Sequence, residues 1–356
     1  MAALFRRWEA LLGVAATWIA LAAVALGVIA FVVGACVGRA QVAFASLASA
    51  WLFAAGAAAG AVALSAAIRL TGGRWADSVL PIADAAPGFF PAAVVLLAAL
   101  TAGAPWWMPH AAVSTTVVRV IRDVLATGVL FAIGMIQVRR AAAASDRPLP
   151  LRWPVCYLLV YAVVLSLWAY DLVLGLLPHA AANTVVPTYY FMGAFVCGIA
   201  WVALVATLRP ETSSDTRHDL GKLLFASIVF LSYLFWSAYF PVWYANVPLE
   251  TAPLLARWRG PFRALTLAVI GTVGFLTFAL LFQEATKRRR ATLGLAAALV
   301  LAGMLAERFL LIVPSVQAPG GAASLLIGSA VTTGVLAQFA LAIASSLPPA
   351  KAEFRQ

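Results

Sequence analysis

The sequence predicts an all-α polytopic membrane protein, with about ten transmembrane helices in a single membrane domain that spans residues 1–356. Two observations lead to this class. Hydrophobic residues make up 64% of the chain and charged residues only 10%, whereas a soluble globular domain carries roughly 25% charged residues. Several apolar runs also exceed the length of about 20 residues that a helix needs to cross a bilayer. The strands of an outer-membrane barrel would be shorter and would alternate in polarity.

Ten apolar segments lie between charged or Pro/Gly-rich breaks, and each is predicted to form one helix. The first follows Arg6 and Arg7 as a signal peptide would, but it is too long and no small-residue cleavage site ends it, so we expect a retained span. The third is short and bounded by Pro and Gly, and residues 72–88 before it are expected to lie at the membrane interface. In chain order the segments span about 11–37, 42–68, 89–105, 117–138, 154–177, 185–208, 220–241, 261–283, 291–313 and 322–346.

The basic residues predict the orientation of the chain. We place the N-terminus on the cytoplasmic side and let successive spans cross the membrane in opposite directions. Seventeen Lys and Arg residues then lie on the cytoplasmic side and three lie within spans. Four lie on the outer side, and these are Arg39, Arg257, Arg259 and Arg263. Loops rich in Lys and Arg stay in the cytoplasm. We therefore predict a multi-pass protein of the bacterial inner membrane with both termini cytoplasmic. The net charge of +11 reflects this topology, and no nucleic-acid partner is expected.

Six charged residues lie inside predicted spans, all within about two turns of the outer end. A charge that faces lipid at depth costs at least about 2.5–3.5 kcal/mol, so we expect these side chains to face protein or water and to pair in one polar layer. The six residues, three basic and three acidic, are Arg119, Arg122, Asp123, Asp171, Glu307 and Arg308. Adjacent residues point to different faces of a helix, so Glu307 and Arg308 are expected to make separate contacts.

This layer has two interpretations. In the structural one, neutralised pairs lock the helices together. In the functional one, Asp123, Asp171 and Glu307 form a proton path or lie next to a quinol, because carboxylates inside a membrane are candidate functional residues. His179, which follows Pro178 at the end of the fifth segment, either passes a proton or bonds a quinone near neutral pH, or caps the helix. The expected pairing partners are Arg119, Arg122 and Arg308.

No cofactor is expected to be bound by this chain itself. Its three cysteines lie in apolar runs without CxxC or CxxCH spacing, which gives no support to a disulfide, a zinc site or a c-type haem. None of its three histidines lies in the middle of a predicted span, where the axial ligands of a b-type haem would be. Any electron transfer would therefore pass through partner proteins.

Two stretches resemble a known family. The first is LWAYDLVLGLLPHAAANTVVPTYYFMGAF, which begins at Leu167, and the second is LFWSAYFPVWYANVPLET, from Leu234 to Thr251. Together they resemble the large integral-membrane subunits of alternative complex III, a quinol:cytochrome c/electron-acceptor oxidoreductase. Those subunits belong to the NrfD-like, or polysulphide-reductase-like, membrane family. The WYANVPLET run is most similar to the ActF-type subunit, and the resemblance covers blocks within residues 68–260.

The resemblance implies two four-helix bundles, formed by helices two to five and six to nine, with the first and tenth helices peripheral. It also implies that the chain is a non-redox-centre subunit, that is, one without a redox centre of its own, in a respiratory complex that oxidises quinol. Quinol or quinone would bind nearby, and membrane lipid would surround the chain. Its partners would be an NrfD-like membrane subunit, an iron–sulfur protein and a multihaem cytochrome c. An outer loop after an aromatic run is expected to dock such a partner through Trp243, Tyr244, Asn246 and Glu250.

Two alternatives stay open. A secondary transporter would use the intramembrane charges as a substrate or coupling-ion site, but such sites lie near the midplane and this layer is displaced outward. In the second alternative the chain is itself the quinol-binding NrfD-like subunit, with quinol near Asp171 and His179. The family pattern has a Gln where Ala238 stands, and an Asp-Trp pair where Asp171 is followed by Leu172. These departures favour an anchoring role with an outward proton path.

Overall fold

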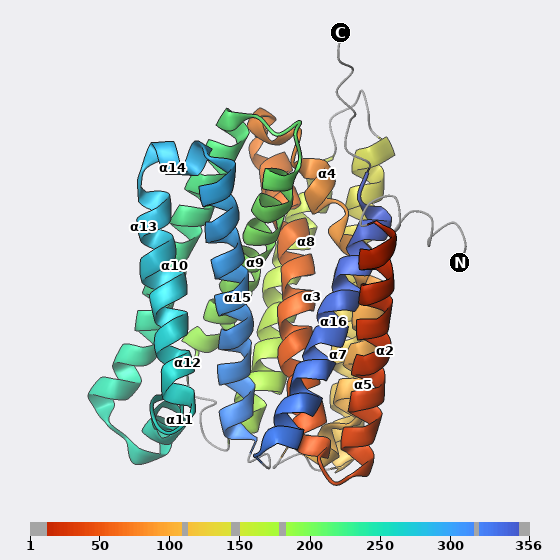
Figure 1. The fold of residues 1–356 in the computed structure, drawn as a ribbon, viewed down its shortest axis with the longest axis vertical. Coiled ribbons are helices and arrows are strands. Elements are labelled where there is room, and N and C mark those ends of the chain that lie inside the picture. Colours follow the sequence, from red (N-terminus) through yellow and green to blue (C-terminus); the bar gives the residue numbers. More distant parts are fainter. Residues whose placement is uncertain (1–12, 109–112, 144–149, 178–182, 317–319, 349–356) are drawn as a thin grey trace.

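The computed structural model describes residues 13–108, 113–143, 150–177, 183–316 and 320–348. Over these residues the protein is helical and contains no strand. Nine helical stretches among them are long and apolar enough to cross a membrane. The long helices run side by side along the long axis of the molecule (Figure 1). The predicted all-α, multi-pass class is confirmed.

Each of the ten predicted segments corresponds to a helix or a run of helices. In chain order these are α2 (Val14–Cys36); α3 (Ala40–Thr71); α4 (Leu80–Ala83), η2 (Ala86–Phe89) and α5 (Phe90–Ala102); α7 (Val113–Ala143); α8 (Arg152–Trp168), η3 (Ala169–Val173) and η4 (Leu174–Leu176); α9 (Val185–Leu208); α10 (Ser214–Ala245); α12 (Phe262–Val269), η6 (Ile270–Leu276) and α13 (Thr277–Phe282); α15 (Arg290–Ile312) and η7 (Val313–Ser315); and α16 (Ala322–Ser346). The short helices between them are η1 (Arg74–Ala76), α6 (Ala104–Trp107), α11 (Pro248–Trp258) and α14 (Glu284–Arg288).

Helix α7 is the one predicted span that is not among the nine apolar helices. Its hydropathy is reduced by Arg119, Arg122 and Asp123 near its start and by Arg139 and Arg140 near its end. It is nevertheless 31 residues long and lies against both α5 and α8. Because α5 and α8 run in the same direction, α7 must return between them, and we assign it as a tenth crossing.

The helices form two four-membered rings. Helices α3, α5, α7 and α8 contact one another in the first ring, and α9, α10, α12–α13 and α15 do so in the second. Contacts of α3 with α9 and α15 join the rings, while α2 and α16 pack on each other and on α3. The expected pair of four-helix bundles with peripheral first and tenth helices is therefore confirmed.

Helix α3 is the centre of the molecule because its small residues allow neighbouring backbones to approach closely. A Cβ atom added at Gly60 would lie 2.8 Å from the carbonyl carbon of Ala194 in α9 and closer still to its oxygen, and one added at Gly198 would lie 2.8 Å from the carbonyl oxygen of Gly60. Small residues at a helix interface are typical of close packing in membranes. Gly60 and Gly198 therefore set the separation of the two bundles.

The start of α2 and the end of α16 lie at the same end of the molecule, which we call the proximal end. The two helices are antiparallel: a Cβ atom at Gly27 would lie 2.8 Å from the Cα atom of Gly334, and one at Gly34 would lie 3.0 Å from Ile327. Helix α14 lies at the proximal end and α11 at the opposite, distal end (Figure 1). At the proximal end Arg288 pairs with Glu284 and lowers the pKa of that carboxyl through its hydrogen bonds.

Residues 72–88 were expected to lie at the membrane interface, but residues from Leu80 onward belong to the third candidate span. Helix α4 packs on α3 and α9, and Ile82 is fully buried. The stretch also supplies Asp84, which accepts hydrogen bonds from Arg69 at 2.6 and 3.0 Å and from the Ser65 hydroxyl at 2.7 Å. This bidentate pair binds residues 80–89 to the proximal end of α3. The third span therefore begins earlier than predicted, at Leu80.

Candidate functional site

Asp171 lies in η3, a turn of π-helix that extends α8 toward the distal end. Trp168, the last residue of α8, is buried. Its Nε1 atom donates a 2.9 Å hydrogen bond to the Oγ1 atom of Thr127 in α7. This bond holds the end of α8 against α7. The wider turn then places the Asp171 side chain toward α7, and π-helical turns of this kind are frequent at functional sites.

Three charged side chains of α7 and η3 meet at this point. The Nε atom of Arg122 lies 2.9 Å from Oδ1 of Asp123, and its Nη2 atom forms an ion pair with Oδ2 of Asp171. The side chain of Asp123 is 2% exposed and that of Asp171 14%, while that of Arg122 is 44% exposed. One guanidinium is thus shared by two carboxylates. We call these three residues the acidic cluster, because its two carboxyl groups share one cation.

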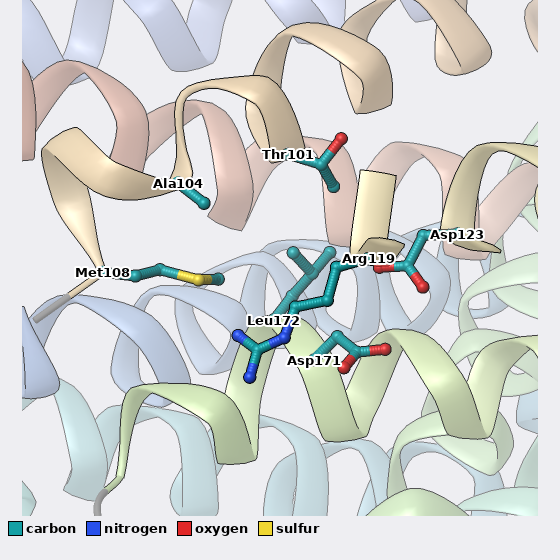
Figure 2. Close-up of a pocket in the computed structure, with 7 residues that line it drawn as sticks. All are labelled: Thr101, Ala104, Met108, Arg119, Asp123, Asp171 and Leu172. Atoms are coloured by element: carbon teal, nitrogen blue, oxygen red, sulfur yellow. The ribbon is translucent and has the colours of Figure 1, made fainter. Parts of the chain in front are cut away.

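A small pocket opens beside the acidic cluster (Figure 2). Arg119 enters it from α7, one turn before Asp123, with its guanidinium turned away from that carboxylate (Figure 2). Arg119 forms no salt bridge with any residue that the structure describes. Ala104, Met108 and Leu172 supply apolar walls, and Thr101 adds a hydroxyl-bearing side chain. The lining residues come from α5, α6, the segment that follows α6, α7 and η3, and they are Thr101, Ala104, Met108, Arg119, Asp123, Asp171 and Leu172.

Glu307 and Arg308 form a second group in α15, and no ion pair between described residues links it to the acidic cluster. These neighbours pair with each other, Nη1 of Arg308 lying 2.9 Å from Oε2 of Glu307. Their long side chains bend toward each other because both are buried, at 0% and 6% exposure. The Arg308 guanidinium lies over the Tyr190 ring, 4.4 Å from its centroid. Neither side chain forms a well-directed hydrogen bond with a described residue.

The predicted docking residues lie at the junction of α10 and α11. Trp243 and Tyr244, in the last turn of α10, are 58% and 77% exposed. Asn246 ends that helix in a left-handed conformation with φ of 49°, and Glu250 lies in the first turn of α11. The expected outer loop is therefore a helix–cap–helix corner. His179 lies outside the described residues.

Sequence reasoning missed several residues that shape the site. Thr127 follows Asp123 by four residues on the same face of α7, so helical spacing would have identified it. Thr101 and Met108 come from a different segment, and nothing in the local sequence indicates that they meet the acidic cluster. Asn183 was also missed: its Nδ2 atom donates a 3.1 Å hydrogen bond to the carbonyl oxygen of Ala238 and joins the start of α9 to α10.

The chemistry open to the site is that of carboxylates and guanidinium groups. Among the described residues no group of three or more His, Cys, Asp or Glu side chains is arranged to hold a metal ion. The acidic cluster can exchange protons and can bind a cation or a hydrogen-bond donor. Comparison with known proteins found no matching family model and no matching curated protein.

Proposed function

We propose that this chain is an integral-membrane subunit of a respiratory quinol-oxidising complex of the alternative complex III type, in the NrfD-like family. It lies in the bacterial inner membrane with its proximal end in the cytoplasm. The distal end anchors extracytoplasmic subunits that carry iron–sulfur clusters and c-type haem. The observation that carries this proposal is the family-like run from Leu234 to Thr251, whose aromatic side chains stand exposed at the distal end.

The geometry of this corner supports docking of a partner. Phe240 packs against Trp243 and Tyr244 with ring centroids 6.1 and 5.9 Å away, which orders the exposed rings before any partner binds. Aromatic side chains that combine a large apolar body with a polar tip are enriched at interfaces. Asn246 and Glu250 add polar groups beside them. The surface is therefore both preorganised and amphipathic.

The acidic cluster supports the second part of the proposal, an outward proton path. Oxidation of quinol releases protons, and carboxylates at membrane depth can carry them to the outer surface. Asp123 is buried and Asp171 lies closer to the surface, so the two form consecutive steps toward the distal end. Arg122 holds both carboxylates in place. The chain supplies no redox centre in this proposal, and electrons pass through the partner subunits.

Purification of the native assembly in mild detergent tests this proposal. We expect the wild-type chain to bring down subunits that contain iron–sulfur clusters and c-type haem. Simultaneous replacement of Trp243 and Tyr244 by Ala should reduce their recovery at least about tenfold, because exposed aromatic anchors dominate interface energies. Phe275→Ala is the matched control, since Phe275 is 74% exposed on η6, away from this corner, and it should leave recovery unchanged.

Two outcomes would contradict the proposal. In the first, the wild-type chain is recovered alone under conditions that preserve other membrane complexes. In the second, the isolated chain transports a labelled solute in liposomes, which would assign the acidic cluster to a transporter.

A further inference from the structure

An exposed apolar stripe on α8 leads to a basic residue at the proximal end. Val163, Leu159 and Val155 are 62%, 65% and 40% exposed. They lie four residues apart, and Arg152 comes three residues before Val155. Residues three or four apart share one face of a helix, so Arg152 is the proximal member of this stripe.

Helix α7 carries a matching stripe. Leu125, Val129 and Ile136 are 63%, 53% and 37% exposed. Ala132, between the last two, is also exposed, and the same spacing continues to the exposed Arg140 near the end of the helix. Helices α7 and α8 pack on each other, and α7 ends at the proximal end, where α8 begins (Figure 1). In a membrane both stripes face acyl chains and both arginines lie at the same surface.

The two arginines meet at one aromatic ring. The guanidinium of Arg140 lies 5.0 Å from the centroid of the Trp153 ring, and that of Arg152 lies 5.7 Å from it. A guanidinium within about 6 Å of a Trp ring is attracted to its face. Trp153 therefore holds two positive charges close together, and neither takes part in an ion pair between described residues. Because like charges repel, an anion that contacts both would stabilise this arrangement.

We propose that Arg140 and Arg152 bind the phosphodiester of an anionic phospholipid, phosphatidylglycerol, in the leaflet at the proximal end. Its two acyl chains lie along the stripes of α7 and α8. Arg is suited to this role because its planar fork of N–H donors matches phosphate oxygens, and basic sites between membrane helices bind anionic head groups. The head group lies at the membrane surface, so the site needs no enclosed cavity. This proposal does not depend on the function proposed above.

Head-group charge and acyl chains both contribute to selectivity. Phosphatidylglycerol carries the negative charge of its phosphate and no cation. The head group of phosphatidylcholine adds a trimethylammonium group, which the two arginines repel. Inorganic phosphate offers the anion but has no acyl chains to cover the apolar stripes. Both should therefore bind more weakly than phosphatidylglycerol.

Thermal unfolding of the delipidated full-length chain in a neutral detergent tests the proposal. Phosphatidylglycerol is expected to raise the melting temperature at a concentration about tenfold lower than phosphatidylcholine with the same chains, since each base near the surface adds to the attraction. The double variant Arg140→Gln with Arg152→Gln should abolish this preference. Arg289→Gln should keep it, because Arg289 is an exposed base that ends α14, on the other side of the proximal end (Figure 1).

A third variant, Trp153→Leu, separates a positioned pair of charges from general attraction between a basic surface and an anionic lipid. It keeps both arginines and removes the ring that holds them, so it should weaken the preference for phosphatidylglycerol. An unchanged preference in Trp153→Leu, or an equal loss in Arg289→Gln and in the double variant, would overturn the proposal.

The wild-type titration decides the matter even where a variant fails to fold. Equal shifts with the two lipids would overturn the proposal. A shift produced by inorganic phosphate at the concentrations that suffice for phosphatidylglycerol would also overturn it, and would assign the arginines to a soluble anion. Native mass spectrometry of the wild-type chain, which should retain phosphatidylglycerol over phosphatidylcholine from an equal mixture, provides an independent measure.

Discussion

Replacing Arg308 by Met is expected to lower the free energy of unfolding by about 3–5 kcal/mol, because it removes the paired cation of a buried carboxylate. Glu307 is only 6% exposed, and among the described residues its ion-pair partner is Arg308, while Arg257 of α11 adds a weaker attraction. The substitution also removes the guanidinium from the face of Tyr190, a contact that is favourable when desolvated. Unfolding of the detergent-solubilised chain, followed by circular dichroism, measures the loss.

The control is the double variant Glu307→Leu with Arg308→Met. A buried ion pair can often be replaced by apolar residues of similar volume at little cost, and here neither side chain forms a well-directed hydrogen bond with a described residue. We therefore expect the double variant to recover most of the stability lost by Arg308→Met alone. A double variant as unstable as the single one would contradict the view that the unpaired charge causes the loss.

Gly60→Ala is expected to destabilise the fold by about 3 kcal/mol, at the upper end of what overpacking costs. The added Cβ atom would lie 2.8 Å from the carbonyl carbon of Ala194 and 3.0 Å from the Cα atom of Phe195. These are backbone atoms of α9, so no rotamer change can relieve the clash. The two bundles would have to separate along their main contact. The same unfolding measurement tests this prediction.

Gly128→Ala provides the comparison for this effect. Gly128 lies in the interior of α7, and a Cβ atom there would meet nothing within 4 Å. Because Ala is the better helix former by about 1 kcal/mol, this variant should be neutral or slightly more stable than the wild type. Equal losses for Gly60→Ala and Gly128→Ala would contradict the view that the close contact between α3 and α9 causes the loss at Gly60.

The sequence predicts the helices well because the membrane requires long apolar runs. The segments 185–208 and 322–346 agree with α9 and α16 at both ends. The third span was placed too late because Asp84 made its first part look interfacial, whereas Arg69 neutralises that charge. That pairing joins residues 15 positions apart on different helices, and hydropathy alone cannot indicate it.

The candidate site was predictable only in part. Scarce charges inside apolar runs identified Asp123, Asp171, Glu307 and Arg308, since such residues must be buried or paired. Their partners depend on helix packing and on side-chain length, so the sequence does not indicate which of these charges pair. The pocket depends in addition on Met108, which is apolar and unremarkable in sequence.

The most direct test of the central claim is reduction of c-type haem in the purified assembly after quinol is added. We predict that the assembly containing the wild-type chain reduces its haem, and that Asp171→Asn slows this reaction at least about tenfold, within the range for a group that transfers protons. Asp77→Asn, an exposed carboxylate in the turn after η1, should leave the rate unchanged. An assembly that contains this chain, and in which quinol reduces no haem, would contradict the claim.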